Sequence, residues 1–175
     1  LAHAEIQRFC KSARNARVFA RSSAAAEYGP GGMKLSGEYG EGALGYLAEW
    51  EDDHEGSATQ CPLVWYVAMR VADRFEATHG HFPGFTDAQF AADEAALRAV
   101  ADTLLDELEL PRKYFTDDHV KETLRWGAAT IASVAAWVGG VAASEVAKVV
   151  THQFEPMNNT VVFNGITGQA ATYRM

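Results

Sequence analysis

A helix that is apolar on almost every side constrains the fold of this chain more than any other feature. The stretch AAWVGGVAASEVAKVVTHQF begins at Ala135, and its valines and tryptophan are spread around the helical wheel. Its only sizeable polar stripe consists of Ser144, Glu145 and Lys148. A helix that is apolar nearly all round is a buried one. The uninterrupted apolar run, Ile131 to Ala143, is shorter than the ~20 residues of a membrane span, so we expect burial against protein.

Small residues leave one region of this helix almost without side chains. Gly139, Gly140 and Ala143 allow another backbone to approach closely, and Val141 lies among them. We therefore predict that Gly139, Gly140, Val141 and Ala143 form an interface.

A turn and a β-hairpin are expected after this helix. Pro156 cannot continue a helix, and Asn158-Asn159 favours a turn. Thr160–Phe163 then reads as a strand, and Ala170–Arg174 can return as its partner. Because an isolated two-stranded hairpin is marginal in water, the helix and hairpin should be completed by a sheet and helices outside this sequence. These would come from the same protein or from a partner.

Length and charge narrow the class of protein. The chain has 175 residues, enough for one ordinary domain or pieces of two, and 48% of them are hydrophobic. A net charge of -8 argues against nucleic acid or an anionic membrane as a partner. We find no signal peptide and expect no membrane span. Cys10 and Cys61 lack metal or redox spacing and suit a reducing compartment, so we expect a cytoplasmic and nuclear protein.

Helices are predicted for most of the chain before Ala129. Apolar periodicity and capping residues place them at Ala2–Tyr28 (one helix or two), at Leu63–Thr78 behind Pro62, from a capping box at Thr86 to about Leu108, and from Thr116 to Trp126. Arg70 and Asp93 are read as parts of solvated faces. Gly29–Gln60 holds eight glycines and an acidic run, which indicate a flexible loop with room for a short helix at Ala43–Trp50.

Three patterns resemble functional sites, and each lacks something that its chemistry requires. Gly40–Gly45 is a literal G-x-G-x-x-G, but no apolar strand precedes it, as a dinucleotide site needs. His79 and His81 form a His-x-His pair without further ligands, so a solvated turn is expected. A cysteine-dependent enzyme would have only Cys61 and His54 to use.

The segment GGVAASEVAKVVTHQFEPMNNTVVFNG resembles the closing helix and strand of the adenylation fold in the enzymes that activate ubiquitin and ubiquitin-like proteins. Within this family, further segments are similar to the regulatory subunits of the neddylation-activating enzyme: Phe9-Cys10, Ala26–Gly29, Trp65–Arg70, Ala72–Phe75, Gly80–Gly84, Asp117–Val120 and Arg125–Ala129. The resemblance covers nearly the whole chain except Gly29–Gln60. It departs from the family at Thr130, Ile131 and Ala132, where an acidic residue and a histidine usually stand.

This resemblance implies the C-terminal third of a catalytically silent subunit in a heterodimer. The partner, the catalytic subunit, would adenylate the C-terminus of the ubiquitin-like modifier with ATP and magnesium and take it onto a cysteine as a thioester. The chain matches neither the family's ATP-binding glycine loop, nor its metal-binding aspartate, nor its catalytic-cysteine motif. No catalytic, cofactor-binding or metal-binding residue is therefore carried over.

The fold implied is mostly α. A helical region like the catalytic-cysteine half-domain would occupy residues 1–129, with the flexible loop at 29–60. Residues 130–175 would be the closing helix and strands of an α/β pseudo-adenylation domain. The start at Leu1 suggests a fragment, and the stop at Met175 favours the regulatory subunit, because the catalytic one continues into a ubiquitin-like domain. Two alternatives stay open: the regulatory subunit of the SUMO-activating enzyme, and a free-standing helical interaction domain.

Overall fold

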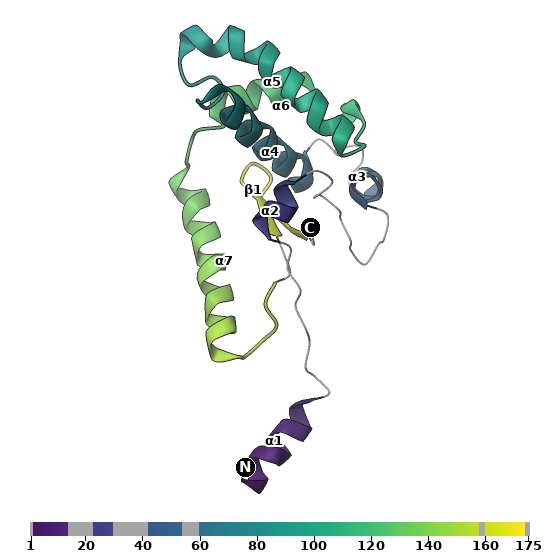
Figure 1. The fold of residues 1–175 in the computed structure, drawn as a ribbon, viewed down its shortest axis with the longest axis vertical. Coiled ribbons are helices and arrows are strands. Elements are labelled where there is room, and N and C mark those ends of the chain that lie inside the picture. The colour runs from purple at the N-terminus through teal and green to yellow at the C-terminus, as the bar shows by residue number, and fades with distance from the viewer. Residues whose placement is uncertain (1, 14–22, 30–41, 54–59, 158–159, 174–175) are drawn as a thin grey trace.

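The computed structural model describes residues 2–13, 23–29, 42–53, 60–157 and 160–173, shown as ribbons in Figure 1. The elements in chain order are α1 (His3–Ala13), α2 (Ala24–Tyr28), α3 (Gly42–Asp53), α4 (Pro62–His79), α5 (Asp87–Glu107), the short 3-10 helix η2 (Arg112–Tyr114), α6 (Asp117–Trp126), α7 (Ala132–Thr151), β1 (Thr160–Asn164) and β2 (Gln169–Tyr173). The predicted architecture, mostly helical with a C-terminal hairpin, is confirmed.

Helix α4 is the centre of the core, with α5 and α6 packed against it (Figure 1). Pro62 stands in its first turn, where the missing backbone N–H costs no helical hydrogen bond. Gly80 closes the helix at φ 75°, a left-handed backbone that glycine adopts without a steric penalty. These three helices contribute many of the largest fully buried side chains: Leu63, Val67, Val71 and Phe75 of α4, Leu97, Leu104 and Leu105 of α5, and Val120 and Leu124 of α6.

The hairpin packs on the same core. Strands β1 and β2 pair antiparallel, with Thr160 opposite Tyr173 and Asn164 opposite Gln169. Val162 and Tyr173 are buried beside α4, and the Asn164 side-chain amide donates a hydrogen bond of 2.9 Å to the carbonyl of Gln60. The helical region and the hairpin therefore share one apolar core, while the predicted division at residue 129 stays a prediction.

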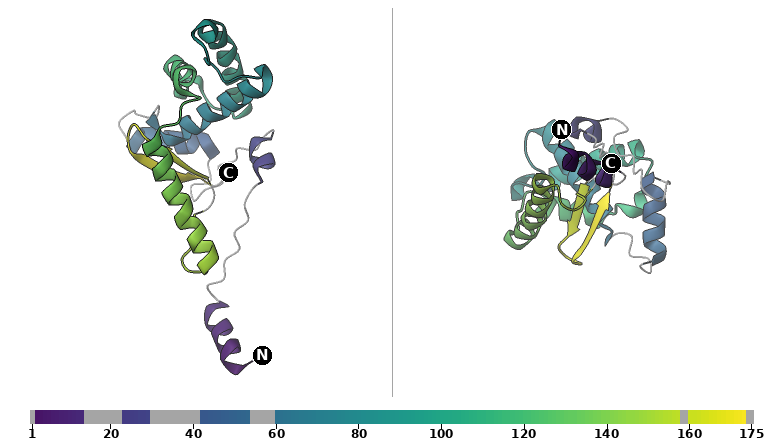
Figure 2. Two further views of the ribbon diagram at one scale, coloured as in Figure 1. Left: turned by 90° about the vertical axis from the view of Figure 1, so that its left-hand side faces the viewer. Right: turned by 90° about the horizontal axis from the view of Figure 1, so that it is seen from below.

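Helix α7 lies outside this core. Figure 2 shows it alongside the hairpin, with one end running on beyond the strands. Trp137 stacks on Phe163 of β1 at a centroid distance of 4.1 Å, and Val134 packs against Gly165. No residue of α7 is buried. The burial expected for this helix is therefore not supplied by the described part of the chain.

Helix α3 lies within the segment that the sequence assigns to a flexible loop. It covers Gly42–Asp53, longer than the short helix considered at Ala43–Trp50, and Leu47 belongs to the core with 1% exposure. The two stretches on either side of it, 30–41 and 54–59, lie outside the described residues. The prediction of a flexible loop there stays a prediction.

Two side chains that the sequence assigned to solvated helix faces, Arg70 and Asp93, are buried. The helix cap predicted at Thr86 also differs from expectation. Arg70 is 5% exposed, because its guanidinium lies over the Tyr28 ring at 4.3 Å and donates to the Glu27 carbonyl. Asp93 is 6% exposed. The Thr86 hydroxyl makes no cap bond to the backbone of α5, because it donates to the Gln89 side chain instead.

Candidate interaction surface

The four residues predicted to form an interface lie near the middle of α7 and differ in exposure. Gly139, Gly140 and Ala143 are exposed, and Val141 is half-buried. A Cβ built at Gly139 or Gly140 would meet no other group within 4 Å. No described part of the chain approaches the backbone at Gly139 or Gly140, so the predicted interface stays a prediction.

Large apolar side chains surround this region, and together with the four residues above they form what we call the α7 surface. The members with the greatest exposure are Trp137 (41%), Val138 (46%), Val146 (62%), Val149 (51%) and Val150 (71%). Single exposed apolar side chains are ordinary, but this many on one helix is typical of a helix that another surface covers. Each valine gains about 1.5 kcal/mol or more when it is fully buried, so covering the α7 surface releases substantial free energy.

Polar contacts fix the last turns of α7 while leaving the α7 surface bare. One oxygen of the Glu145 carboxylate accepts from Lys148 at 2.6 Å, and the other accepts from the backbone N–H of Met157 at 2.7 Å. The chain reverses through His152 and Phe154, whose φ angles are 53° and 63°. The polar stripe of the helix thus holds the following turn in place, and the apolar sides are left for other contacts.

By length and composition alone, α7 could also cross a membrane. Among the helices of the described residues it alone meets that test, with a mean hydropathy of 1.3 over its most apolar window and none of that window buried. This corrects the sequence argument, which measured only the run to Ala143 and stopped before Ser144. One helix of this kind is weak support for a span, and the ion pair of Glu145 and Lys148 interrupts its apolar surface.

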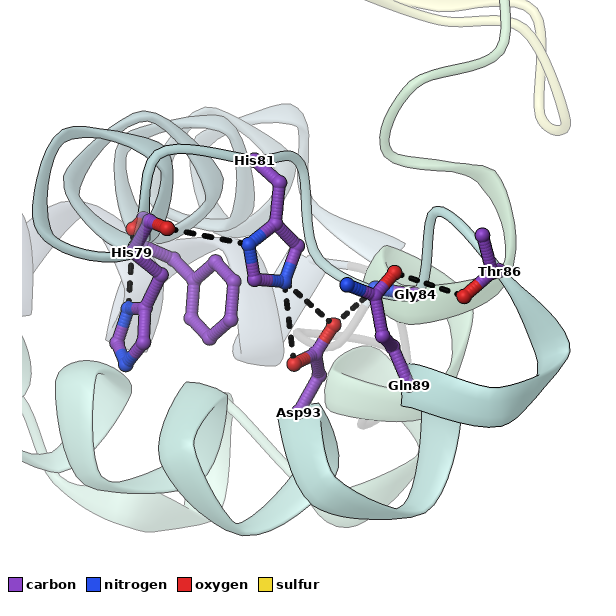
Figure 3. Close-up of polar contacts among 7 residues, drawn as sticks. His79, His81, Gly84, Thr86, Gln89 and Asp93 are labelled. Carbon is purple, nitrogen blue, oxygen red and sulfur yellow. Dashed lines mark hydrogen bonds and ion pairs between the residues drawn. The ribbon is translucent and has the colours of Figure 1, made fainter.

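The His-x-His turn is a structural contact between α4 and α5, not an isolated solvated turn (Figure 3). His81 Nε2 lies 3.2 Å from a carboxylate oxygen of Asp93, and the backbone N–H of Gly84 donates to that same oxygen at 2.9 Å. His79 instead stacks on Phe75 at 4.1 Å. Among the described residues no group of three metal-ligating side chains comes together, here or elsewhere. Asp93 joins the two helices across their connecting turn.

The thiols are placed differently from each other. Cys10 is exposed on α1, a helix that Figure 1 shows apart from the rest of the chain. Cys61 is fully buried at the start of α4, with its sulfur 3.9 Å from the Tyr173 hydroxyl. Burial raises the pKa of the Cys61 thiol, which opposes formation of a nucleophilic thiolate. His54, its only sequence-predicted companion, lies outside the described residues, as do Gly40 and Glu41 of the glycine pattern.

Sequence reasoning did not find the contact between α2 and α4. The Tyr66 hydroxyl donates to the Glu27 carboxylate, and burial is the main reason that the pKa of Tyr66 is raised. Arg70 completes this cluster through the Glu27 carbonyl, at 3.1 Å. The one available signal was the similarity of both segments, Ala26–Gly29 and Trp65–Arg70, to the same protein family. The cluster pins a short helix to the core and contains no arrangement suited to catalysis.

Comparison with known proteins identifies relatives along nearly the whole chain, although no family model matches. The chain is 33% identical over 174 residues to the NEDD8-activating enzyme E1 regulatory subunit of Danio rerio, an alignment that covers 98% of this chain and 29% of that protein. It is 40% identical over 121 residues to the regulatory subunit AXR1 of Arabidopsis thaliana, covering 69% of this chain and 21% of that protein.

The similarity to a sister enzyme is lower. SUMO-activating enzyme subunit 1 of Bos taurus is 27% identical over 120 residues. The chain spans less than a third of the length of the regulatory subunits that it matches. Several such subunits, from animals and a plant, are 30–40% identical to it over most of its length. The chain belongs to the family of NEDD8-activating enzyme E1 regulatory subunits.

Proposed function

We propose that this chain is part of the regulatory, non-catalytic subunit of a heterodimeric enzyme that activates NEDD8 for conjugation to proteins. The observation that carries the proposal is the 33% identity over 98% of the chain to a protein named for that role. In this proposal ATP and magnesium are bound by the catalytic subunit, which also forms the thioester with the modifier. The complex works in the cytoplasm and nucleus.

The α7 surface gives this role a physical basis. A regulatory subunit that scaffolds a catalytic one needs a contact surface more than it needs reactive groups. The exposed valines and the open backbone at Gly139 and Gly140 supply such a surface. We propose that it is covered by the α/β part of the complete protein or by the catalytic subunit. The buried thiol of Cys61, with its raised pKa, is consistent with a subunit that takes no part in the chemistry.

The test is reconstitution of the complete protein with its catalytic subunit, ATP and purified modifier. We expect a thioester between NEDD8 and the catalytic subunit, visible on a non-reducing gel, that requires both subunits. SUMO should not be charged. Efficient charging of SUMO but not NEDD8 would favour the sister enzyme instead, and failure of the subunits to assemble would favour a free-standing interaction domain.

The non-catalytic assignment is tested separately by removing both thiols of this chain. With Cys10→Ala and Cys61→Ala combined, the catalytic subunit should still form its thioester, because Cys61 is buried and neither cysteine lies in a motif that lowers a thiol pKa. The matched control is the same assay after substitution of the catalytic cysteine of the partner. Loss of the thioester in the double variant, with the complex still assembled, would contradict the assignment.

A further inference from the structure

Helix α3 contacts two separate parts of the fold, the helical core and the hairpin. Of its residues Gly45–Glu51, only Leu47 is buried. For comparison, α4 buries ten residues. Among the described side chains of α3, one is therefore fully buried, and Tyr46 and Trp50 pack against the core while partly exposed.

The anchor enters an apolar site on the helical core. Leu47 lies over a small cavity lined by Leu63, Val64, Val67, Leu105, Leu110, Tyr114 and Phe115. The lining consists mostly of apolar side chains, and Leu47 lacks van der Waals contacts where the cavity remains. Leu47 is thus shielded from solvent without being tightly packed.

An ion pair on the surface adds a second attachment. The Glu51 carboxylate accepts from Lys113 at 2.9 Å and from the Tyr114 hydroxyl at 3.2 Å. The side chains of Glu51 and Lys113 are 37% and 59% exposed, so salt screens their attraction. This attachment should weaken as the ionic strength rises.

The third attachment reaches the hairpin. Tyr46 packs edge-on against Tyr173 of β2 at a centroid distance of 5.1 Å, and their hydroxyls are 3.4 Å apart. The same Tyr173 hydroxyl lies 3.9 Å from the buried sulfur of Cys61. Helix α3 therefore covers the corner where β2 meets the start of α4.

We propose that α3 is a strap that opens and closes over this corner while the rest of the core stays folded. Closed, it joins the helical core to the hairpin and shields Cys61. When α3 is open, the apolar site that Leu47 occupies and the edge of the Tyr173 ring are exposed to solvent. Among the described side chains of α3, opening withdraws the fully buried Leu47 and the partly buried Tyr46 and Trp50, which is far less than global unfolding exposes, so it requires less free energy. This inference is independent of the proposed function.

The test uses Cys61 as a reporter of strap opening in the complete protein. The protein is treated with iodoacetamide under native conditions, and peptide mass spectrometry measures labelling at Cys61 and at Cys10. Cys10 is exposed and should be labelled at once in every variant. Cys61 should be labelled slowly, at a rate set by opening.

Two variants should speed labelling of Cys61. Leu47→Ala removes the anchor and should raise the rate at least about tenfold. Glu51→Gln should raise it about two- to fivefold in low salt, and that difference should vanish in 1 M salt. Ala48→Gln, at an exposed position on the same helix, is the matched control and should leave the rate unchanged.

Urea distinguishes strap opening from global unfolding. A local opening exposes little surface, so Cys61 labelling should depend only weakly on low concentrations of urea. Amide exchange at Phe75, in the centre of α4, reports the global reaction in the same samples. The proposal is overturned if Cys61 labelling rises with urea as steeply as exchange at Phe75, or if neither strap variant changes it.

Discussion

Gly84 is the residue on which the structure places the tightest steric requirement. Its φ of 68° is left-handed, and a Cβ there would stand 2.3 Å from the carbonyl oxygen of Leu124 in α6. Its N–H is also bound to Asp93. Gly80, at the other end of the same turn, has a φ of 75° but nothing within 4 Å of a Cβ. The two glycines share a backbone conformation and differ in their surroundings.

Alanine at these two positions should therefore have unequal effects. Gly80→Ala carries only the left-handed strain and should cost about 1–2 kcal/mol. Gly84→Ala carries the same strain and must also push α6 away, so its cost should be clearly larger. Amide exchange of α6 in the complete protein measures the difference. Equal protection of α6 in the two variants would mean that the Leu124 contact is absent.

Substitutions of Asp93 can separate the contribution of its bond with Gly84 from that of its contact with His81. Asp93→Ala leaves the half-buried N–H of Gly84 without its acceptor and should cost about 1–3 kcal/mol in unfolding free energy. Asp93→Asn keeps an acceptor for that N–H, so it should cost less. Glu94→Gln, one residue further along α5, serves as the control for loss of a carboxylate. Urea unfolding followed at the α4–α5 turn ranks the three variants, and an equal loss in all three would contradict a specific role for Asp93.

The burial of Arg70 and Asp93 shows where residue-level prediction from sequence ends. Helical periodicity identifies which side of a helix is polar, and it assigned both residues to polar sides. It does not identify a partner that arrives from elsewhere in the chain. Arg70 is covered by α2, and Asp93 by the turn that holds His81 and Gly84. Burial of a charged side chain depends on such partners, so these two could not have been found from periodicity alone.

At the scale of elements, the sequence predicts well wherever the signal is local. Helix α4 begins at Pro62 and ends at His79, within one residue of the predicted limits, because a proline start and a glycine stop flank a clear apolar stripe. The hairpin strands are likewise within one residue of expectation. The length of helix α3 was underestimated, because its glycines and acidic residues disfavour a helix prediction and give no sign that Leu47 packs in the core.

Whether the α7 surface is covered in the complete complex determines if one substitution, Gly140→Leu, stabilises or destabilises the protein. If Gly140 remains exposed, Gly140→Leu should stabilise α7 by about 1 kcal/mol, because glycine is a poor helix former. If another backbone packs there, as we predict, the leucine should overpack the contact and cost about 1–3 kcal/mol. Size-exclusion chromatography with the catalytic subunit and amide exchange of α7 distinguish the cases. Unchanged assembly and a more protected α7 would contradict the predicted interface.

At the scale of the whole molecule, the contacts that unite the fold are distant in sequence. Tyr46 and Tyr173 are 127 residues apart, and Cys61 and Tyr173 are 112 apart. Neither pairing has a local signature, so the sequence predicts the parts of the core without showing that the hairpin and α4 share it. The family resemblance gives the structures that would cover α7 only as an expectation, because most of the relatives' length lies outside this chain.

Limited proteolysis tests the arrangement of the whole chain. The glycine-rich and acidic composition of 31–60 predicts the first cuts there, and the described helix α3 should confine them to its two flanks, 31–41 and 54–59. Helix α5 contributes several core residues and should resist. A broad-specificity protease with mass spectrometry of the products measures this. Early cleavage inside Asp87–Glu107 would mean that the assignment of core and loop is wrong.

The bare α7 surface also bears on how a cell would treat a newly made copy of this protein. Until α7 is covered, its exposed valines resemble the surface of an incompletely folded protein, which chaperones bind and proteases remove. Covering the helix would end that recognition. The amount of the protein in a cell would then follow the supply of whatever covers α7, and surplus copies would be degraded without any dedicated signal.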